Sequence, residues 1–186
     1  MRKDAIENRQ RIEETALQLF NEEGVNNVSM NRIAKELGVG MGTLYRHFKD
    51  KGDLCYSLIQ RDVDDFLTKL YQTKHQYHSA YDILDASLTL LLQFKVDNQS
   101  LLHCIEQNKN KTRFFQSKFY QQLFNFYYSI FDKLDTQFAT FKADMLIHSL
   151  STQIFEFQRE DRTLSIDQYK AFLLQIYYTD EVTSND

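Results

Sequence analysis

The segment 41–48 carries the side chains of this chain that are best suited to hydrogen bonding along an extended polar surface: Thr43, Tyr45, Arg46 and His47. On a short helix they form the polar side. Hydroxyl and imidazole groups donate to phosphate oxygens, and a guanidinium group pairs bidentately with guanine in the major groove. These residue types at this spacing favour binding to double-stranded DNA over catalysis.

The elements that would position this segment form a helix-turn-helix. The apolar pattern of residues 30–37 predicts a first helix, with Ser29 as its N-cap. A turn with two glycines follows, and a second helix is predicted over residues 41–48. Leu44 and Phe48 fall on its apolar side and are expected in the core. In such motifs the second helix lies in the major groove.

The glycines support this arrangement. All five lie within the first 52 residues. Gly24 and Gly38 follow amphipathic runs, where a left-handed residue closes a helix. Gly42 has no such role, and near the start of a short helix it costs about 1 kcal/mol relative to alanine. We therefore interpret Gly42 as a place where a partner approaches the backbone closely.

Residues 8–58 closely resemble the TetR family of bacterial transcriptional regulators. The matching positions are Ala16, Leu19, Phe20, Gly24, Ile33, Ala34, Leu37, Gly38, Val39, Gly42, Thr43, Leu44, Tyr45, His47, Phe48, Lys51 and Leu54. The resemblance implies an all-α homodimer, usually a repressor, that leaves its operator when a small molecule binds the C-terminal domain. The family often has a small hydroxyl residue in the turn, where this chain has Gly40. Glycine is also acceptable as an N-cap.

Matched to the family motif, Thr43 and Tyr45 would hold phosphates or reach a base edge. Arg46 is the candidate for direct readout of guanine, and Met41 for contact with a thymine methyl group. A phosphate contact is expected from Lys51, beside a helix N-terminus. The expected DNA-binding set is Ser29, Met41, Gly42, Thr43, Tyr45, Arg46, His47 and Lys51.

The whole chain is expected to be all-α, because 186 residues contain no proline and many strong helix formers. About nine helices are predicted from the apolar periodicity. Residues 1–50 would form the helix-turn-helix domain, and residues 51–186 a helical ligand-binding and dimerisation domain. A helix over about 51–72 would connect them. Further helices are predicted at 79–95, 99–108, 112–134, 138–160 and 166–178, the last with a capping box of Ser165 and Gln168.

Charge and sequence signatures limit the possible classes of protein. The net charge is −4, but residues 1–60 carry nine basic and nine acidic residues, which is compatible with a dimer making a few phosphate contacts per subunit. The chain lacks a membrane-length apolar run and a signal-peptide core, so a cytoplasmic protein is expected. Cys55 and Cys104 suit a reducing compartment as buried thiols. No catalytic motif is present, and no enzyme activity is expected.

Aromatic residues accumulate in the C-terminal part, where 17 of the 26 Phe and Tyr residues lie beyond position 110. A helix over 112–134 is apolar on more than one face. It is either a central helix buried on several sides or one wall of a cavity for an apolar or aromatic effector. The candidate cavity residues are Gln107, Phe115, Phe119, Tyr127, His148 and Gln153. The alternative is a DNA-binding dimer without a small-molecule inducer, or an activator.

The last two predicted helices carry apolar stripes, so a homodimer through a four-helix bundle is expected. The expected interface residues are Leu146, Ser149, Leu150, Thr152, Phe172 and Ile176.

A metal site is the weaker interpretation of His75, His78 and Asp82. Their spacing would place all three on one helix face, but residues 73–79 look like a loop. No metal or other cofactor is therefore expected.

Overall fold

The described residues, 2–107 and 117–178 of this computed structural model, form ten α-helices and no strand. The all-α prediction is confirmed for these ranges. A chain without proline can run long helices without losing backbone hydrogen bonds. Within the same ranges, no helix has the length and apolar character needed to cross a membrane.

The chain divides into two compact units. Unit 1 contains the residues up to Arg61 together with α6 (Gln99–Gln107), and unit 2 contains the rest. The boundary between these two units lies inside α4 (Lys51–Gln76). The reason is burial: Leu54 and Cys55, in the second turn of α4, are fully buried in the core of unit 1.

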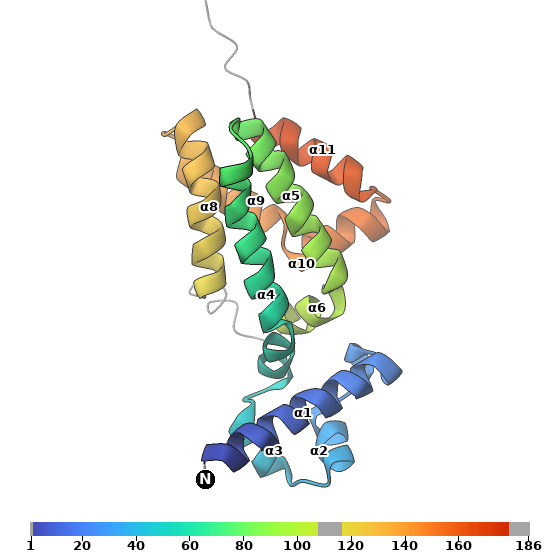
Figure 1. Cartoon of the computed structure of the whole chain (residues 1–186). Helices are drawn as coiled ribbons and strands as arrows, with labels where there is room; N and C mark the ends of the chain where they lie inside the picture. The colour runs from blue at the N-terminus through green and yellow to red at the C-terminus, as the bar shows by residue number, and fades with distance from the viewer. Residues whose placement is uncertain (1, 108–116, 179–186) are drawn as a thin grey trace, which may run out of the picture. The chain divides into compact units, whose positions relative to one another are not determined.

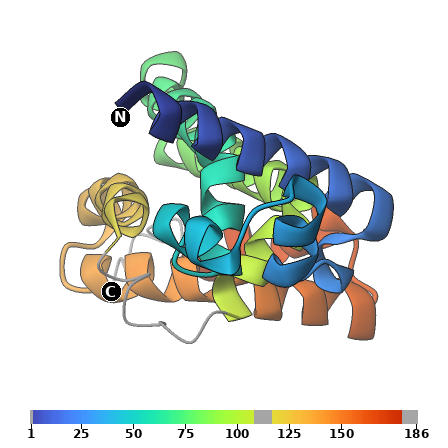
Figure 2. The same ribbon diagram turned by 90° about the horizontal axis from the view of Figure 1, so that it is seen from below.

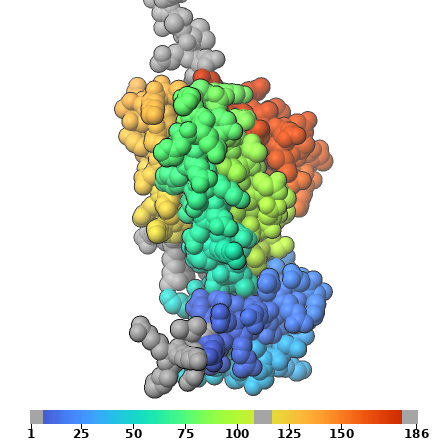
Figure 3. All heavy atoms as spheres, in the orientation of Figure 1, coloured from blue at the N-terminus to red at the C-terminus, as the bar shows by residue number. Residues whose placement is uncertain are grey.

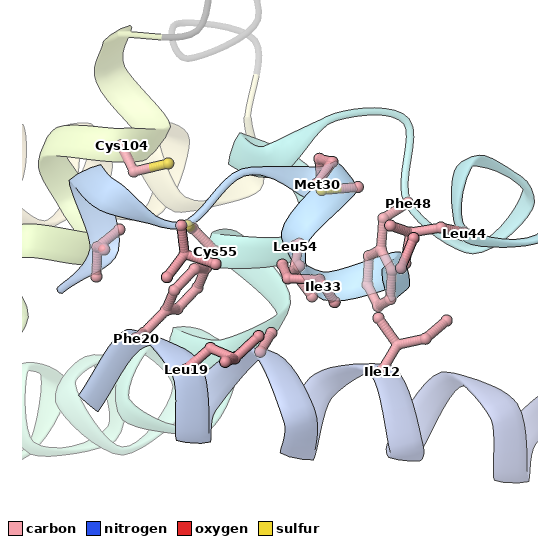
Figure 4. Close-up of a cluster of buried hydrophobic side chains, with 14 residues drawn as sticks. Ile12, Leu19, Phe20, Met30, Ile33, Leu44, Phe48, Leu54, Cys55 and Cys104 are labelled. Atoms are coloured by element: carbon pink, nitrogen blue, oxygen red, sulfur yellow. The ribbon is translucent and has the colours of Figure 1, made fainter. Parts of the chain in front are cut away.

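Unit 1 contains the predicted helix-turn-helix. Its elements are α1 (Arg2–Glu23), a short 3-10 turn η1 (Val25–Asn27), α2 (Met30–Leu37), α3 (Met41–His47), the first part of α4, and α6. Helix α2 packs on both α1 and α3, as Figures 1 and 2 show. The largest side chains of its core converge between these helices in Figure 4, namely Ile12, Leu19, Phe20, Met30, Ile33, Leu44, Phe48 and Leu54.

Local signals in the sequence set the ends of these helices. Ser29 Oγ accepts a hydrogen bond from Arg32 N at 3.1 Å, which caps α2 as predicted. Gly38 ends α2 with φ of 67°, a left-handed conformation that favours glycine. Asp50 Oδ1 accepts from Asp53 N at 2.8 Å at the start of α4. These caps fix where α3 begins and ends relative to its neighbours.

Unit 2 consists of the remainder of α4 with α5 (Ala80–Asp97), α8 (Lys118–Leu134), α9 (Ala139–Ser149), α10 (Thr152–Glu156), a π-helical turn η2 (Phe157–Asp161) and α11 (Ile166–Tyr177). Helix α8 packs on α9 and α5, and α11 packs on α5 and α9. On the face shown in Figure 3, α8, α4 and α5 follow one another across this unit. The predicted capping box of Ser165 and Gln168 is present at α11.

The prediction of a single helix over 138–160 is wrong, because the helix is interrupted at Leu150 and Ser151. Tyr169 donates its hydroxyl proton to the Ser149 carbonyl, which an unbroken helix would use internally. Lys95 Nζ donates to Thr152 Oγ1 at 3.1 Å just after the break. Both partners come from other helices of unit 2, so the interruption is a tertiary effect.

Helix α4 is longer than the sequence predicted. Helix α4 continues to Gln76, so residues 73–76 are helical and not a loop. The predicted start of a helix at residue 112 lies outside the described residues.

Candidate nucleic-acid interface

Helix α3 separates its apolar and polar residues sharply. Leu44 and Phe48 are fully buried, whereas Tyr45 is 48% exposed and Arg46 is also exposed. Thr43 and His47 are half-buried at the edges of this surface. The structure thus brings the predicted polar residues of the motif together on one side of a short helix held by its buried side.

Arg46 folds back along its own helix. Its Nε donates to Gly42 O at 3.2 Å, and Nη2 donates to Thr43 Oγ1 at 3.1 Å. These are exposed contacts whose loss costs little in water. To reach a base edge, the guanidinium must exchange both for contacts to DNA.

The backbone at Gly42 is accessible to a partner molecule. A Cβ atom built there would meet nothing within 4 Å, so packing inside the chain does not require glycine. Ser29 is exposed, and because its oxygen already accepts a bond from Arg32 N, its hydroxyl proton can be donated outward. Met41 is half-buried and packs against the core of unit 1, which leaves only part of its side chain for contact with a base.

Lys51 makes contacts within unit 1 that the sequence did not predict. Its ammonium donates to the Val25 carbonyl and lies 5.7 Å from the centre of the Phe20 ring. The side chain is half-buried. Lys51 therefore ties the start of α4 to η1, and its contact with phosphate stays a prediction.

The positive charge around the motif is partly neutralised. Arg32 forms ion pairs with Glu23 at 2.9 Å and Glu36 at 2.6 Å. The hydrogen bond to Glu36 is the main cause of the raised pKa of Arg32. Lys35 and Lys49 are exposed, whereas Arg32 is half-buried and ion-paired.

Arg9 is a residue of this region that sequence reasoning missed. Its guanidinium lies 4.4 Å above the Phe48 ring, and Nη1 donates to His47 O at 3.5 Å. It thus joins α1 to the C-terminal end of α3. No local pattern could reveal this contact, because it depends on how α1 packs.

The six candidate cavity residues do not form one cluster. Gln107 belongs to unit 1 and is exposed, while His148 and Gln153 are exposed on unit 2. Phe115 lies outside the described residues. The interior positions are Phe119, half-buried 6.2 Å from the Phe66 ring, and Tyr127, fully buried.

Tyr127 is the unusual member of that set. Its hydroxyl makes no hydrogen bond within the described residues. Ser87 approaches it, and because the Ser87 hydroxyl donates its proton to Leu84 O at 2.8 Å, only the lone pairs of Ser87 face the Tyr127 hydroxyl. Burial is the main cause of the raised pKa of Tyr127. An unsatisfied buried hydroxyl costs about 1–3 kcal/mol, so this position calls for a polar partner.

Half of the predicted dimer residues need correction. Leu146, Leu150 and Thr152 are at most 3% exposed and pack inside unit 2, so they cannot meet a partner chain. Ser149 is half-buried. Phe172 and Ile176 are 46% and 65% exposed on α11, as an interface would require.

The apolar surface of α9 is formed instead by Phe138, Phe141 and Met145, which are 49%, 64% and 42% exposed. The sequence could not separate the two faces, because α9 carries apolar residues on both.

No metal centre is evident in residues 2–107 and 117–178, where no group of three or more His, Cys, Asp or Glu side chains is placed to hold an ion. His75 and His78 are both exposed.

Comparison with known proteins places this geometry among bacterial regulators. Residues 12–56 match the model of the family described as bacterial regulatory proteins, tetR family. Over 186 residues and 100% of both chains, the protein is 63% identical to an HTH-type transcriptional regulator of Staphylococcus aureus (strain bovine RF122 / ET3-1). It is 62% identical, with the same coverage, to another from strain MSSA476.

Solved structures share the fold at low sequence identity. Thermus thermophilus FadR, a TetR-family repressor in complex with lauroyl-CoA, superposes with a TM-score of 0.70 at 14% identity, covering 96% of this chain and 99% of that one. Bacillus subtilis FadR, in complex with stearoyl-CoA, gives 0.63 at 16% identity, covering 90% and 96%.

Proposed function

The chain belongs to the TetR family of bacterial transcriptional regulators, and from this premise we propose that it is a repressor that binds operator DNA through α3. The observation that carries the proposal is the surface of α3, where Tyr45 and Arg46 are exposed beside the open backbone of Gly42. A rigid helix with buried anchors and an exposed polar side suits the major groove.

Within this surface, Arg46 is assigned to base readout, and Thr43, Tyr45 and His47 to phosphate and base-edge contacts. Gly42 permits close approach, and Ser29 donates from the start of α2. Lys35 and Lys49 add long-range attraction to phosphates. Because the chain as a whole is acidic, binding depends on this local surface and should weaken steeply with salt.

The test uses duplexes selected by the reduced protein from a random-sequence pool. Fluorescence anisotropy should show tight binding to a selected duplex and much weaker binding to the same bases in scrambled order. Tyr45→Ala should lower affinity for the selected duplex, while Glu7→Ala, an exposed change on α1, serves as the matched surface control. Equal binding to selected and scrambled duplexes would contradict sequence-specific recognition.

We also propose that the protein acts as a homodimer through the exposed apolar residues of α9 and α11. These are Phe138, Phe141, Met145, Phe172 and Ile176. The two helices pack on each other within unit 2, and a shared interface would use the outer residues of both. Such exposed apolar surface typically marks an interaction site, and paired helices from two subunits make a four-helix bundle.

Light scattering of Phe141→Glu should give the mass of one chain at micromolar concentration, because a buried unpaired carboxylate destabilises an interface. The control Thr140→Glu introduces the same charge at the neighbouring exposed position. A monomeric unaltered protein, or an altered Phe141 variant that remains dimeric, would overturn this assignment.

The third part of the proposal is release of DNA by an apolar or aromatic effector bound inside unit 2. The support is the fully buried hydroxyl of Tyr127, which has no hydrogen-bond partner in the described residues. The Phe126 ring, whose centre lies 5.3 Å from that of the Tyr127 ring, suits an apolar ligand, and one polar group to orient it is typical of such sites. An effector acts only through different affinities for the two states of the protein.

A panel of aromatic acids and acyl-CoA thioesters provides the test, read as thermal shift and as loss of duplex binding. A coupling of about 1–3 kcal/mol corresponds to roughly 5–150-fold in operator affinity. Tyr127→Phe should weaken the response and leave duplex binding without effector intact. A panel that leaves duplex binding unchanged would favour a DNA-binding dimer without a small-molecule inducer.

A further inference from the structure

Two cysteines from different helices meet in the core of unit 1. Cys55 lies in the second turn of α4 and Cys104 in α6, and both belong to the cluster shown in Figure 4. In Figure 4 their side chains lie close together, and each thiol shifts the pKa of the other. Neither is in a disulfide in this structure. Buried thiols often serve only as packing groups, but a facing pair can also be oxidised together.

Access to the pair is unequal. Cys55 is fully buried, whereas Cys104 is 9% exposed and lines a hollow of about 470 Å³ that opens to solvent. The other residues around this hollow are Asn26, Lys51, Gly52 and Gln107. A small oxidant can therefore reach the sulfur of Cys104 directly from the hollow. The sulfur of Cys55 is shielded from solvent.

The electrostatics likewise make Cys104 the more reactive of the two thiols. A hydrogen bond from Cys55 and the ammonium of Lys51 lower the pKa of Cys104 to about 7, because both stabilise its thiolate. The pKa of Cys55 is raised, first because its thiol is the donor in that bond and second because it is buried. The thiolate is the reactive form of cysteine, so Cys104 is the attacking group and Cys55 the resolving group.

We propose that Cys104 and Cys55 form a peroxide-sensitive thiol switch that controls DNA binding by unit 1. This inference rests on the proposed binding of operator DNA through α3. The Cys104 thiolate attacks one oxygen of hydrogen peroxide, the O–O bond breaks, and hydroxide leaves. The sulfenic acid at Cys104 is then attacked by the sulfur of Cys55, and water leaves as the disulfide forms. Two thiols and one peroxide give one disulfide and two waters.

The disulfide must change the position of α4. Its sulfur–sulfur bond is about 2.05 Å long, shorter than any non-bonded contact between two sulfur atoms, so the two cysteines, and the α4 and α6 turns that carry them, are drawn together. The first turn of α4 directly follows α3 and is tied to η1 through Lys51. Leu54, next to Cys55, packs in the same core as Leu44 of α3. A shift of this turn therefore alters the surface that α3 presents.

The experiment treats the full chain with hydrogen peroxide and measures two quantities separately. Mass spectrometry of the intact and digested protein should show loss of two hydrogen atoms and a peptide pair joined through Cys55 and Cys104. Anisotropy with the pool-selected duplex should show affinity falling roughly 5–150-fold, the usual range for coupled sites, with recovery on adding a dithiol. Cys104→Ala and Cys55→Ala should each bind the duplex like the unaltered protein when reduced.

After peroxide, Cys104→Ala should keep its affinity. The control Asn26→Ala, which changes the same hollow but keeps both thiols, should respond like the unaltered protein. Failure of the reduced protein to select any duplex would count against the proposed DNA binding and leave the mass measurement to decide the chemistry. No disulfide, a disulfide between two chains, or full peroxide sensitivity in Cys104→Ala would overturn the switch.

Discussion

The two units place their polar groups in opposite ways. In unit 1 the polar residues of α3 face outward while Leu44 and Phe48 are buried. In unit 2 polar side chains are enclosed within a core rich in aromatic rings, as at Thr73, Ser87, Lys95 and Thr152. Unit 1 therefore leaves polar groups available at its surface, whereas unit 2 encloses polar groups within its core.

Most of the enclosed groups in unit 2 are satisfied locally. Thr73 Oγ1 donates to Leu70 O at 2.7 Å, and Ser87 Oγ donates to Leu84 O at 2.8 Å. The exceptions are Tyr127 Oη and Arg159 Nε, for which no hydrogen-bond partner is found in the described residues. Buried polar groups without partners are rare and costly, so these two groups identify where unit 2 departs from a purely structural core.

The largest expected effect separates the two faces of α3. Phe48→Ala should destabilise unit 1 by about 3–5 kcal/mol, the cost of truncating a buried aromatic side chain, and should abolish duplex binding. Tyr45→Ala, on the exposed side of the same helix, should change stability by less than about 0.5 kcal/mol yet lower duplex affinity. Urea unfolding and anisotropy measure the two effects. Equal loss of stability in both variants would show that α3 has no distinct outward face.

The next effect tests the roles within the outward face. Arg46→Ala should relax sequence preference, costing about 1–3 kcal/mol at one base pair of each half-site. Lys51→Ala should weaken binding evenly across sequences and lower the salt slope by about one unit per lost phosphate contact.

Because Lys51 also bonds to the Val25 carbonyl, its variant should lose some thermal stability, whereas Arg46→Ala should not. Binding to a panel of single-base duplex variants at several salt concentrations measures both roles. Identical changes in affinity and specificity for the two variants would refute the assignment.

A smaller effect concerns the thiol pair of unit 1. Cys104 is neutral below its pKa of about 7 and a thiolate above it, so its alkylation by iodoacetamide should speed up as pH rises. From about pH 6 to about pH 8 the rate should increase roughly tenfold. The groups that set this midpoint are Cys55, Lys51, Asp50 and His103. In Cys55→Ala the midpoint should rise, because the hydrogen bond to the thiolate is lost; an unchanged midpoint would contradict that cause.

The smallest expected effect concerns the buried hydroxyl of Tyr127 in unit 2. Tyr127→Phe removes a buried hydroxyl that has no partner, so it should leave stability unchanged or raise it by about 1 kcal/mol. Tyr120→Phe is the matched control, because the Tyr120 hydroxyl donates to Asp144 and its loss should destabilise. Thermal unfolding of both variants without effector measures the contrast. A destabilised Tyr127→Phe would mean that this hydroxyl is already satisfied in the protein.

Local signals in the sequence determined most of unit 1. Ser29 and Gly38 mark the ends of α2 through a side-chain cap and a left-handed backbone, and both effects act within a few residues. The spacing of Leu44 and Phe48 shows which side of α3 is buried. The exposure of Tyr45 and Arg46 on the other side follows from it. Periodicity suffices here because each helix has one apolar face.

Only the tertiary structure decided the interior of unit 2 and the contacts between distant segments. Helix α9 is apolar on two faces, so the sequence pattern could not tell Leu146, which is buried, from Phe141, which is exposed. The break after Ser149 depends on Tyr169 from another helix. The facing of Cys55 and Cys104 likewise requires α6 to pack in unit 1. Such contacts depend on how helices pack, which residue spacing along the chain does not determine.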